Sequence, residues 1–152
     1  MNRKIEFFVP GAPVGKGRPR AVRRGAGVAM FTPGGTAIYE SMVALVAQQA
    51  MAAAGAAPMA GALSVSLDVG MAIPLSWSKK KRAAAAAGEI FPTAKPDIDN
   101  VSKAILDACN GIVFGDDSQV VELVVVKCYA EGPGVLMWVG PAPVRTGAKN
   151  AV

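Results

Sequence analysis

The sequence predicts a mixed α/β (α+β) domain, in which a small β-sheet packs with about three helices and ends in an antiparallel hairpin. Its 152 residues suit one domain, and 52% of them are hydrophobic. Residues Leu63 to Met71 alternate apolar and polar side chains, which is typical of a half-buried strand. Segments after Thr36 and after Asn100 place apolar residues at spacings of three and four, which favours amphipathic helices. Because these helices alternate with strands along the chain, the sequence favours a mixed fold.

The N-terminal third is predicted to be a strand, a loop and a helix. Residues Ile5 to Val9 favour a strand, which a Pro-Gly pair stops. The stretch from Gly11 to Gly35 is rich in glycine and proline and is predicted to be a loop. Thr36 is the expected N-cap of a helix that continues to about Ala54. The face of this helix that we expect in the core comprises Ile38, Met42, Leu45, Val46 and Gln49.

The C-terminal half is predicted to hold two helices and the final hairpin. Ser78 is the expected N-cap of a short helix with a basic first turn, and Asp99 or Asn100 caps the next helix. Residues Val120 to Tyr129 favour a long strand. A Gly-Pro-Gly turn is expected to return this strand into Val135 to Val139 as an antiparallel hairpin.

The domain organisation is simple. We assign residues 1–140 to a single domain and predict a disordered C-terminal tail for residues 141–152. Apolar runs long enough to span a bilayer, about 18–20 residues, do not occur, so no membrane partner is expected. The first residues are charged, and Glu6 and Pro10 interrupt the apolar run that follows, which argues against a secretion signal. A cytoplasmic location is therefore expected.

The composition narrows the chemistry that the protein can perform. The chain has no histidine, which excludes a histidine base in a catalytic triad and histidine-based zinc sites. Its two cysteines, Cys109 and Cys128, are too few for a cysteine-rich zinc site and are expected to be buried free thiols. A bound metal must therefore have oxygen ligands, which favours Mg²⁺ or Mn²⁺. The net charge of +5 is a weak indication of a nucleic-acid partner.

The acidic residues gather between Lys95 and Glu122. The chain has 11 acidic residues, and five of them are aspartates in this stretch, namely Asp97, Asp99, Asp107, Asp116 and Asp117. Aspartates two apart in extended backbone point the same way, and their carboxylates repel unless a cation lies between them. We therefore predict that Asp97, Asp99, Asp116 and Asp117 hold a metal, and that Lys103 points to the same place. Helix caps and surface turns are the alternative interpretation, in which Asp107 also serves structure.

Two basic segments precede this stretch in the chain. The glycine-rich N-terminal segment contains Lys16, Arg18, Arg20, Arg23 and Arg24. The second segment, Lys79, Lys80, Lys81 and Arg82, begins a helix, where cations oppose the helix dipole. Local stability does not explain cations there, so both segments are candidates for contact with DNA phosphates. A solvated loop and a solvated helix end are the alternatives.

The motifs together resemble the RusA family of Holliday-junction resolvases, found in phages and prophages. The resemblance rests on Lys95-Pro-Asp-Ile-Asp-Asn-x-x-Lys103, on Leu-Asp-Ala-x-Asn-Gly and on Asp116-Asp-Ser-Gln-Val, with support from the N-terminal basic motif and Ser76-Trp-Ser-Lys. It implies a homodimeric, Mg²⁺-dependent endonuclease, with Mn²⁺ as a substitute, that nicks four-way DNA junctions symmetrically in recombination and repair. It places the catalytic carboxylates on Asp97, Asp99 and Asp117 and the essential lysine on Lys103.

Two alternative functions stay open. In the first, the protein is a phage nuclease that cuts flaps or other branched DNA. In the second alternative it is a DNA-binding protein without catalysis, in which the acidic cluster is structural.

Overall fold

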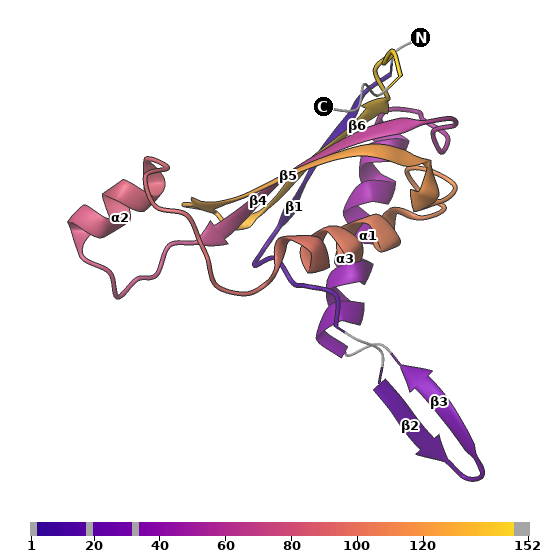
Figure 1. Ribbon diagram of the computed structural model, residues 1–152, viewed down its shortest axis with the longest axis horizontal. Coiled ribbons are helices and arrows are strands. Elements are labelled where there is room, and N and C mark those ends of the chain that lie inside the picture. The colour runs from indigo at the N-terminus through magenta and orange to yellow at the C-terminus, as the bar shows by residue number, and fades with distance from the viewer. Residues whose placement is uncertain (1–2, 18–19, 32–33, 148–152) are drawn as a thin grey trace.

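The computed structural model describes residues 3–17, 20–31 and 34–147. Its main element is a four-stranded sheet with the spatial order β1, β6, β4, β5 (Figure 1). The strands are β1 (Ile5–Pro10), β4 (Leu63–Ala72), β5 (Val120–Ala130) and β6 (Gly134–Pro141). Three α-helices accompany them within the described residues, so the predicted mixed α/β class is confirmed.

The two C-terminal strands run antiparallel, but they do not pair with each other. Strand β6 pairs antiparallel with both β1 and β4, whereas β5 pairs parallel with β4. The hairpin predicted from the turn is therefore interrupted by β4, which lies between its two arms. The three strands approach closely where β4 lies between β5 and β6, since a Cβ on Gly70 of β4 would lie 3.0 Å from Ala130 Cβ and 3.2 Å from Gly134 O. A turn motif specifies that the chain reverses but not which strand becomes its neighbour.

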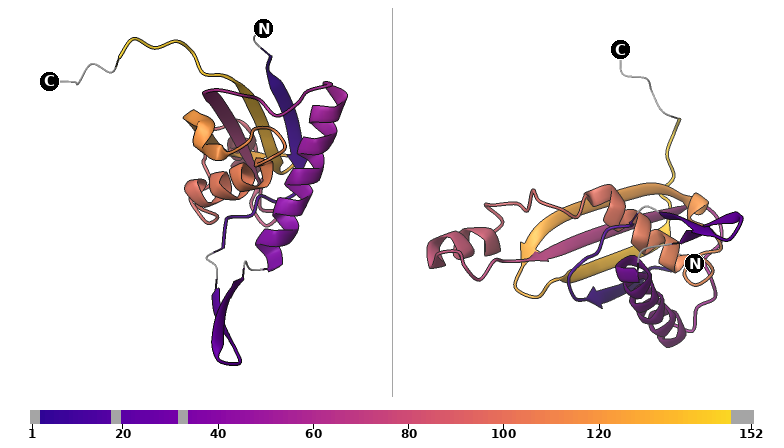
Figure 2. Two further views of the ribbon diagram at one scale, coloured as in Figure 1. Left: turned by 90° about the vertical axis from the view of Figure 1, so that its right-hand side faces the viewer. Right: turned by 90° about the horizontal axis from the view of Figure 1, so that it is seen from below.

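Strand β4 sits at the centre of the core. Leu63, Val65, Leu67 and Val69 are buried on one face, as the alternation predicted, and Asp68 is exposed on the other. Helices α1 (Gly34–Ala53) and α3 (Ile98–Cys109) cover the buried face (Figure 2). The long connection from β4 to the parallel strand β5 carries α3, as parallel pairing requires.

The predicted core face of the first helix is only partly right: Met42 and Val46 pack against the core, but the other predicted residues are exposed. Ile38 is 75% exposed and Leu45 is 54% exposed. The buried residues of α1 are instead Thr36, Tyr39, Val43, Ala47 and Met51. Because the helix is rich in alanine and apolar nearly all round, the spacing of its larger side chains did not identify the packed stripe.

Thr36 also differs from its predicted role as the N-cap. It lies inside α1, which begins at Gly34. Its Oγ1 accepts a hydrogen bond from Gly17 N at 3.0 Å and donates to Gly15 O at 3.2 Å. A buried hydroxyl needs such partners, and here they fasten the preceding segment to the helix.

The predicted N-terminal loop contains a separate hairpin. Strands β2 (Arg20–Arg24) and β3 (Gly27–Phe31) pair antiparallel across a turn at Gly25, whose φ of 58° suits glycine. The hairpin extends away from the main sheet (Figures 1 and 2). Glycine and proline dominated the composition of this segment, so two short strands that pair only with each other gave little signal.

The other helix starts are close to prediction. Ser78 caps α2 (Lys79–Ala86), and its hydroxyl accepts from Lys81 N at 3.2 Å, as predicted. Helix α3 begins slightly earlier than predicted, with Asp97 rather than Asp99 or Asn100 at the N-cap. None of the helices within the described ranges is long and apolar enough to cross a membrane.

The remaining expectations concern the tail and the cysteines. Strand β6 continues through Pro141, and Ala142 N donates to Ala62 O at 3.0 Å. The disordered tail expected over 141–152 stays a prediction, because part of it lies outside the described residues. Both cysteines are free thiols. Cys109 is buried, which raises its pKa to about 12, whereas Cys128 is only half-buried.

Candidate active site

Asp97 and Asp99 stand exposed at the entrance to α3. Asp97 has extended backbone angles (φ −68°, ψ 145°), and its side chain makes no capping hydrogen bond to the helix. Asp99 lies in the first helical turn. The positive end of the helix dipole favours carboxylates at this position. Both groups therefore remain available to bind a cation.

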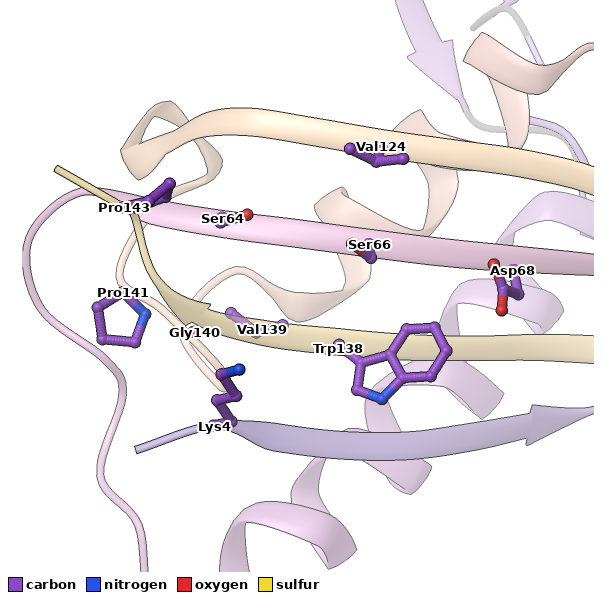
Figure 3. Close-up of a pocket in the computed structure, with 10 residues that line it drawn as sticks. All are labelled: Lys4, Ser64, Ser66, Asp68, Val124, Trp138, Val139, Gly140, Pro141 and Pro143. Carbon is purple, nitrogen blue, oxygen red and sulfur yellow. The ribbon is translucent and has the colours of Figure 1, made fainter. Parts of the chain in front are cut away.

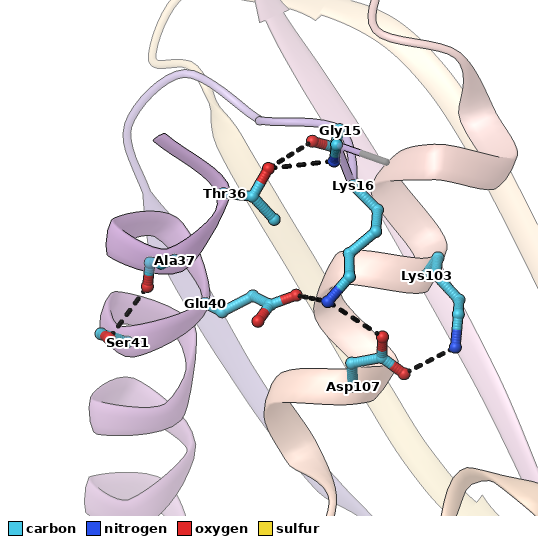
Figure 4. Close-up of polar contacts among 9 residues, drawn as sticks. Gly15, Lys16, Thr36, Ala37, Glu40, Ser41, Lys103 and Asp107 are labelled. Atoms are coloured by element: carbon cyan, nitrogen blue, oxygen red, sulfur yellow. Dashed lines mark hydrogen bonds and ion pairs between the residues drawn. The ribbon is translucent and has the colours of Figure 1, made fainter. Parts of the chain in front are cut away.

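Lys103 lies one turn after Asp99 and contacts Asp107 in a charged network (Figure 4). Lys103 Nζ is 2.9 Å from Asp107 Oδ1, and Lys16 Nζ is 3.2 Å from Asp107 Oδ2. Lys16 Nζ also donates to Glu40 Oε1 at 2.5 Å. The network thus joins the segment before the hairpin, α1 and the middle of α3.

The pKa values in this network follow from its hydrogen bonds. Burial by itself would raise the pKa of Asp107, but the bonds from Lys103 and Lys16 outweigh it and hold that pKa below its ordinary value. The bond to Glu40 is the main cause that raises the pKa of Lys16. The bond to Asp107 raises the pKa of Lys103, with a further contribution from the charge of Asp117. Asp107, Lys16 and Lys103 are therefore charged at neutral pH.

Lys16 already has ion-pair partners within the protein. Its side chain is 20% exposed and already pairs with two carboxylates. A contact between Lys16 and DNA phosphate, predicted from the sequence, stays a prediction, and the structure gives this lysine a role in joining elements.

Asp116 and Asp117 lie at the start of the short 3₁₀ helix η1 (Asp117–Gln119), next to α3. Asp116 is the N-cap, and its carboxylate accepts from Ser118 N at 3.1 Å, which lowers its pKa. Asp117 is half-buried and close enough to Lys103 for their charges to attract. The carboxylate of Asp116 is thus part of the capping box of η1, whereas that of Asp117 is not.

Gln119, which sequence reasoning missed, fixes this turn. Its Oε1 accepts from the backbone amides of Gly115 and Asp116 at 2.9 Å and 3.1 Å. Its Nε2 donates to Met59 O at 2.9 Å and Gly61 O at 3.0 Å. The available signal was its place three residues after Asp116, the spacing of a capping box.

The predicted metal ligands are not gathered into one cluster. Within residues 3–17, 20–31 and 34–147, no three acidic, histidine or cysteine residues lie close enough together to hold a metal ion. Their chemistry still fits a hard divalent cation, because the candidate donors are all carboxylate oxygens. Binding such an ion with both pairs requires the segments around Asp97 and Asp117 to approach each other.

A shallow hollow of about 430 Å³ lies beside Lys103 and Asp99. Helix α3 contributes Ile98, Ser102 and Leu106 to it in addition, and β5 contributes Leu123 and Val125. Leu123 is 41% exposed because α3 does not cover the edge strand completely. The charged side chains thus border an apolar surface formed by α3 and β5.

The two basic segments project on opposite sides of α3 (Figures 1 and 2). In the hairpin, Arg23 is exposed. Arg20 and Arg24 also lie on β2, and only their backbone is described, whereas Arg18 lies outside the described residues. In the first turn of α2, Lys79, Lys80, Lys81 and Arg82 are all exposed. Lys81 Nζ lies 3.9 Å from the Trp77 ring centroid, and Trp77 packs edge-on against Tyr129 with centroids 5.3 Å apart. These aromatic contacts tie the basic turn to β5.

Exposed carboxylates and a lysine at a helix entrance, with basic projections on both sides, define a class of site suited to cutting a polyanion. The comparison of families agrees, because residues 10–139 match the family described as "Endodeoxyribonuclease RusA". The chain therefore belongs to the RusA endodeoxyribonuclease family. It is also similar to "Uncharacterized protein YqaN" of Bacillus subtilis (strain 168), with 41% identity over 133 residues that cover 86% of this chain and 92% of that protein.

Proposed function

We propose that the protein is a Mg²⁺-dependent endonuclease that resolves four-way DNA junctions by paired symmetric nicks. The observation that carries the proposal is the arrangement at α3, where Asp97 and Asp99 are exposed at its entrance and Lys103 follows one turn later. Membership of an endodeoxyribonuclease family supports the same reaction class. The proposal includes the cytoplasmic location that the sequence led us to expect.

Each residue of the site would have a separate role in the reaction. Asp97, Asp99 and Asp117 would hold the metal, with Asp116 as a further candidate. The bound metal would supply an activated water and neutralise charge on the scissile phosphate. Lys103, whose ammonium Asp107 holds at 2.9 Å, would contact a phosphate oxygen and stabilise the negative charge that develops there.

The basic projections would hold the DNA across this site. Arginines on β2 and the basic first turn of α2 lie on either side of α3, so a duplex arm that bridges them would pass the carboxylates. Phosphate contacts of this kind position DNA without reading its sequence. Recognition of a junction would then come from the directions in which the two projections hold neighbouring arms.

We further propose that the uncovered face of the sheet joins two copies in a homodimer. No helix of the described residues lies on this face, and Phe8, Val124 and Val126 are 48%, 52% and 45% exposed there. A hollow of about 530 Å³ runs along it, lined by residues that include Ser66, Asp68 and Trp138 (Figure 3). Paired incisions in a two-fold symmetric junction need two sites related by a two-fold axis, which an isologous dimer provides.

The decisive experiment uses an end-labelled four-way junction with Mg²⁺ and then with EDTA. Symmetric nicks in opposed strands that disappear on chelation are the expected result. Cleavage confined to flaps and forks would favour a branched-DNA nuclease instead. Binding without cleavage in either Mg²⁺ or Mn²⁺ would leave only the DNA-binding function.

A further inference from the structure

Lys127 is an unusual residue for the place it occupies. It lies on β5, where it is the register partner of the fully buried Val69 and follows Leu123 and Val125 along the face that α3 packs against. Lys127 is half-buried, so its ammonium needs hydrogen-bond partners to replace the water that it loses on this face. Its position near the start of α3 is also unfavourable, because the helix dipole is positive at that end. Something other than helix stability must therefore account for this lysine.

Its partners are the backbone carbonyls that lead into the acidic motif. Lys127 Nζ donates to Ala94 O at 2.8 Å and to Pro96 O at 3.0 Å. These hydrogen bonds are charge-assisted and therefore stronger than bonds between neutral groups. One ammonium thus bridges two carbonyls on either side of Lys95.

The bond to Pro96 fixes the backbone on which Asp97 stands. The carbonyl of Pro96 and the amide of Asp97 belong to one rigid peptide plane, so holding the oxygen orients that plane. The next plane is held as well, because Asp97 O accepts from Val101 N at 3.1 Å. With both planes held, the direction in which the Asp97 side chain leaves the backbone is determined.

The opposite side of the same segment is also packed. Lys16 N donates to Asn100 O at 2.8 Å. A Cβ added to Gly15 would lie 3.1 Å from Asn100 Cβ and 3.2 Å from Pro96 Cβ, so the backbone there approaches closely. The acidic segment therefore lies between Lys127 on β5 and the stretch around Gly15 and Lys16 that leads to the basic hairpin.

We propose that Lys127 is a positioning residue for the metal-binding carboxylates. It acts on Asp97 through the Pro96 carbonyl and does not contact the metal or the DNA. The inference rests on the proposed function, since it gives Lys127 a part in the metal affinity of that site. A lysine that only satisfied two carbonyls would contribute to folding and leave metal affinity unchanged.

The test compares Lys127→Met and Lys127→Arg with the wild-type protein. Junction cleavage at saturating DNA is measured across a Mg²⁺ titration, and Mn²⁺ binding without DNA is measured by calorimetry. We expect Lys127→Met to need about 10–100-fold more metal for half-maximal cleavage, the usual cost of losing a group that orients a metal ligand. Lys127→Arg keeps the charged donor and should recover most of the affinity.

Arg3→Met is the matched control. Arg3 Nη2 donates to Ala54 O at 2.6 Å at the far end of α1, so this variant also removes a cation from a backbone carbonyl. It should leave the metal requirement unchanged. Hydrogen exchange of the Val101 amide, which donates to Asp97 O, should quicken in Lys127→Met and stay at the wild-type rate in Arg3→Met.

The outcomes separate the inference from the proposed function. A wild-type protein that cleaves, together with a Lys127→Met variant of unchanged metal requirement and unchanged local exchange, overturns the inference alone. A wild-type protein that neither cleaves junctions nor binds Mn²⁺ overturns the proposed function and the inference with it. If Lys127→Met does not fold, Lys127→Gln, which keeps one donor without the charge, takes its place in the same comparison.

Discussion

Replacing Asp107 tests the charged network that holds Lys103. Asp107 accepts from Lys16 at 3.2 Å and from Lys103 at 2.9 Å, and its side chain is 21% exposed. Asp107→Asn keeps the size and one acceptor but removes the charge. Lys16 retains Glu40 in this variant, whereas no other carboxylate is within ion-pair distance of Lys103 among the described residues.

The expected loss of stability is modest and follows from the exposure of each partner. A hydrogen bond to a charged group contributes about 1.5–3 kcal/mol when buried, and we reduce this to about 1–1.5 kcal/mol for the partly exposed bond to Lys16. Lys103 is 59% exposed, so its pair with Asp107 is worth about 0.3–0.5 kcal/mol. Removing both interactions should therefore cost about 1.5–2 kcal/mol, or about 3–8 °C in Tm for a chain of this size.

The pH dependence gives a sharper signature. The folded pKa of Asp107 lies below its unfolded value of about 3.9, so its contribution is fully present above that pH. The contribution is lost as the pH falls through the folded pKa. The raised pKa values of Lys16 and Lys103 act at the other end, where stability is present below about pH 10.4 and lost as the pH rises through the folded values.

The assay is urea unfolding of the wild type and of Asp107→Asn at pH values from about 3 to 10, with Glu89→Gln as an exposed-carboxylate control. The difference in unfolding free energy between wild type and Asp107→Asn should be constant near neutral pH and shrink in acid. A difference that stays the same down to pH 3, or a variant as stable as Glu89→Gln, would refute the assignment of this network.

Three further predictions follow from the site and the surfaces. Asp97→Asn and Asp117→Asn should each lower junction cleavage at least about 100-fold but preserve binding in a gel-shift assay, since losing a carboxylate reduces repulsion toward phosphates; a parallel loss of binding would show a structural role. Replacing Arg20 and Arg23 by glutamine together should reduce the slope of log K against log salt by about 1.8, and an unchanged slope would exclude the hairpin from phosphate contact. Val126→Glu, on the uncovered face where Val126 is 45% exposed, should convert the proposed dimer to a monomer in sedimentation, and an unaltered oligomer would place the interface elsewhere.

The sequence predicted those parts of the fold that depend on local pattern. Alternation identified the buried side of β4, and Ser78 marked the start of α2 because its hydroxyl caps that helix directly. Partnerships between distant segments were not predictable in the same way. Nothing local to the turn after β5 indicates that β4 inserts beside β6, since that depends on the glycines at 70 and 134 meeting across strands.

The site shows the same division. The spacing of Asp99 and Lys103 on α3 follows from helix geometry, and Asp97 lies just before that helix, as expected from the sequence. Lys127 and Gln119 were missed because their roles arise from bonds to backbone carbonyls more than 30 residues away, at Ala94 and at Met59. The sequence reports the charge of Lys16 but not the two carboxylates that the fold brings to it, so its ion pairs were not foreseen.

The central claim is that carboxylates from two segments beside α3 share one metal. A crystal structure of the protein soaked in Mn²⁺, with the ion located by its anomalous scattering, tests this most directly. The account predicts Mn²⁺ bound by Asp97 or Asp99 together with Asp117, and a shorter separation between the two segments than in the metal-free structure. Mn²⁺ bound elsewhere, or held by one segment with the other left apart, would contradict it.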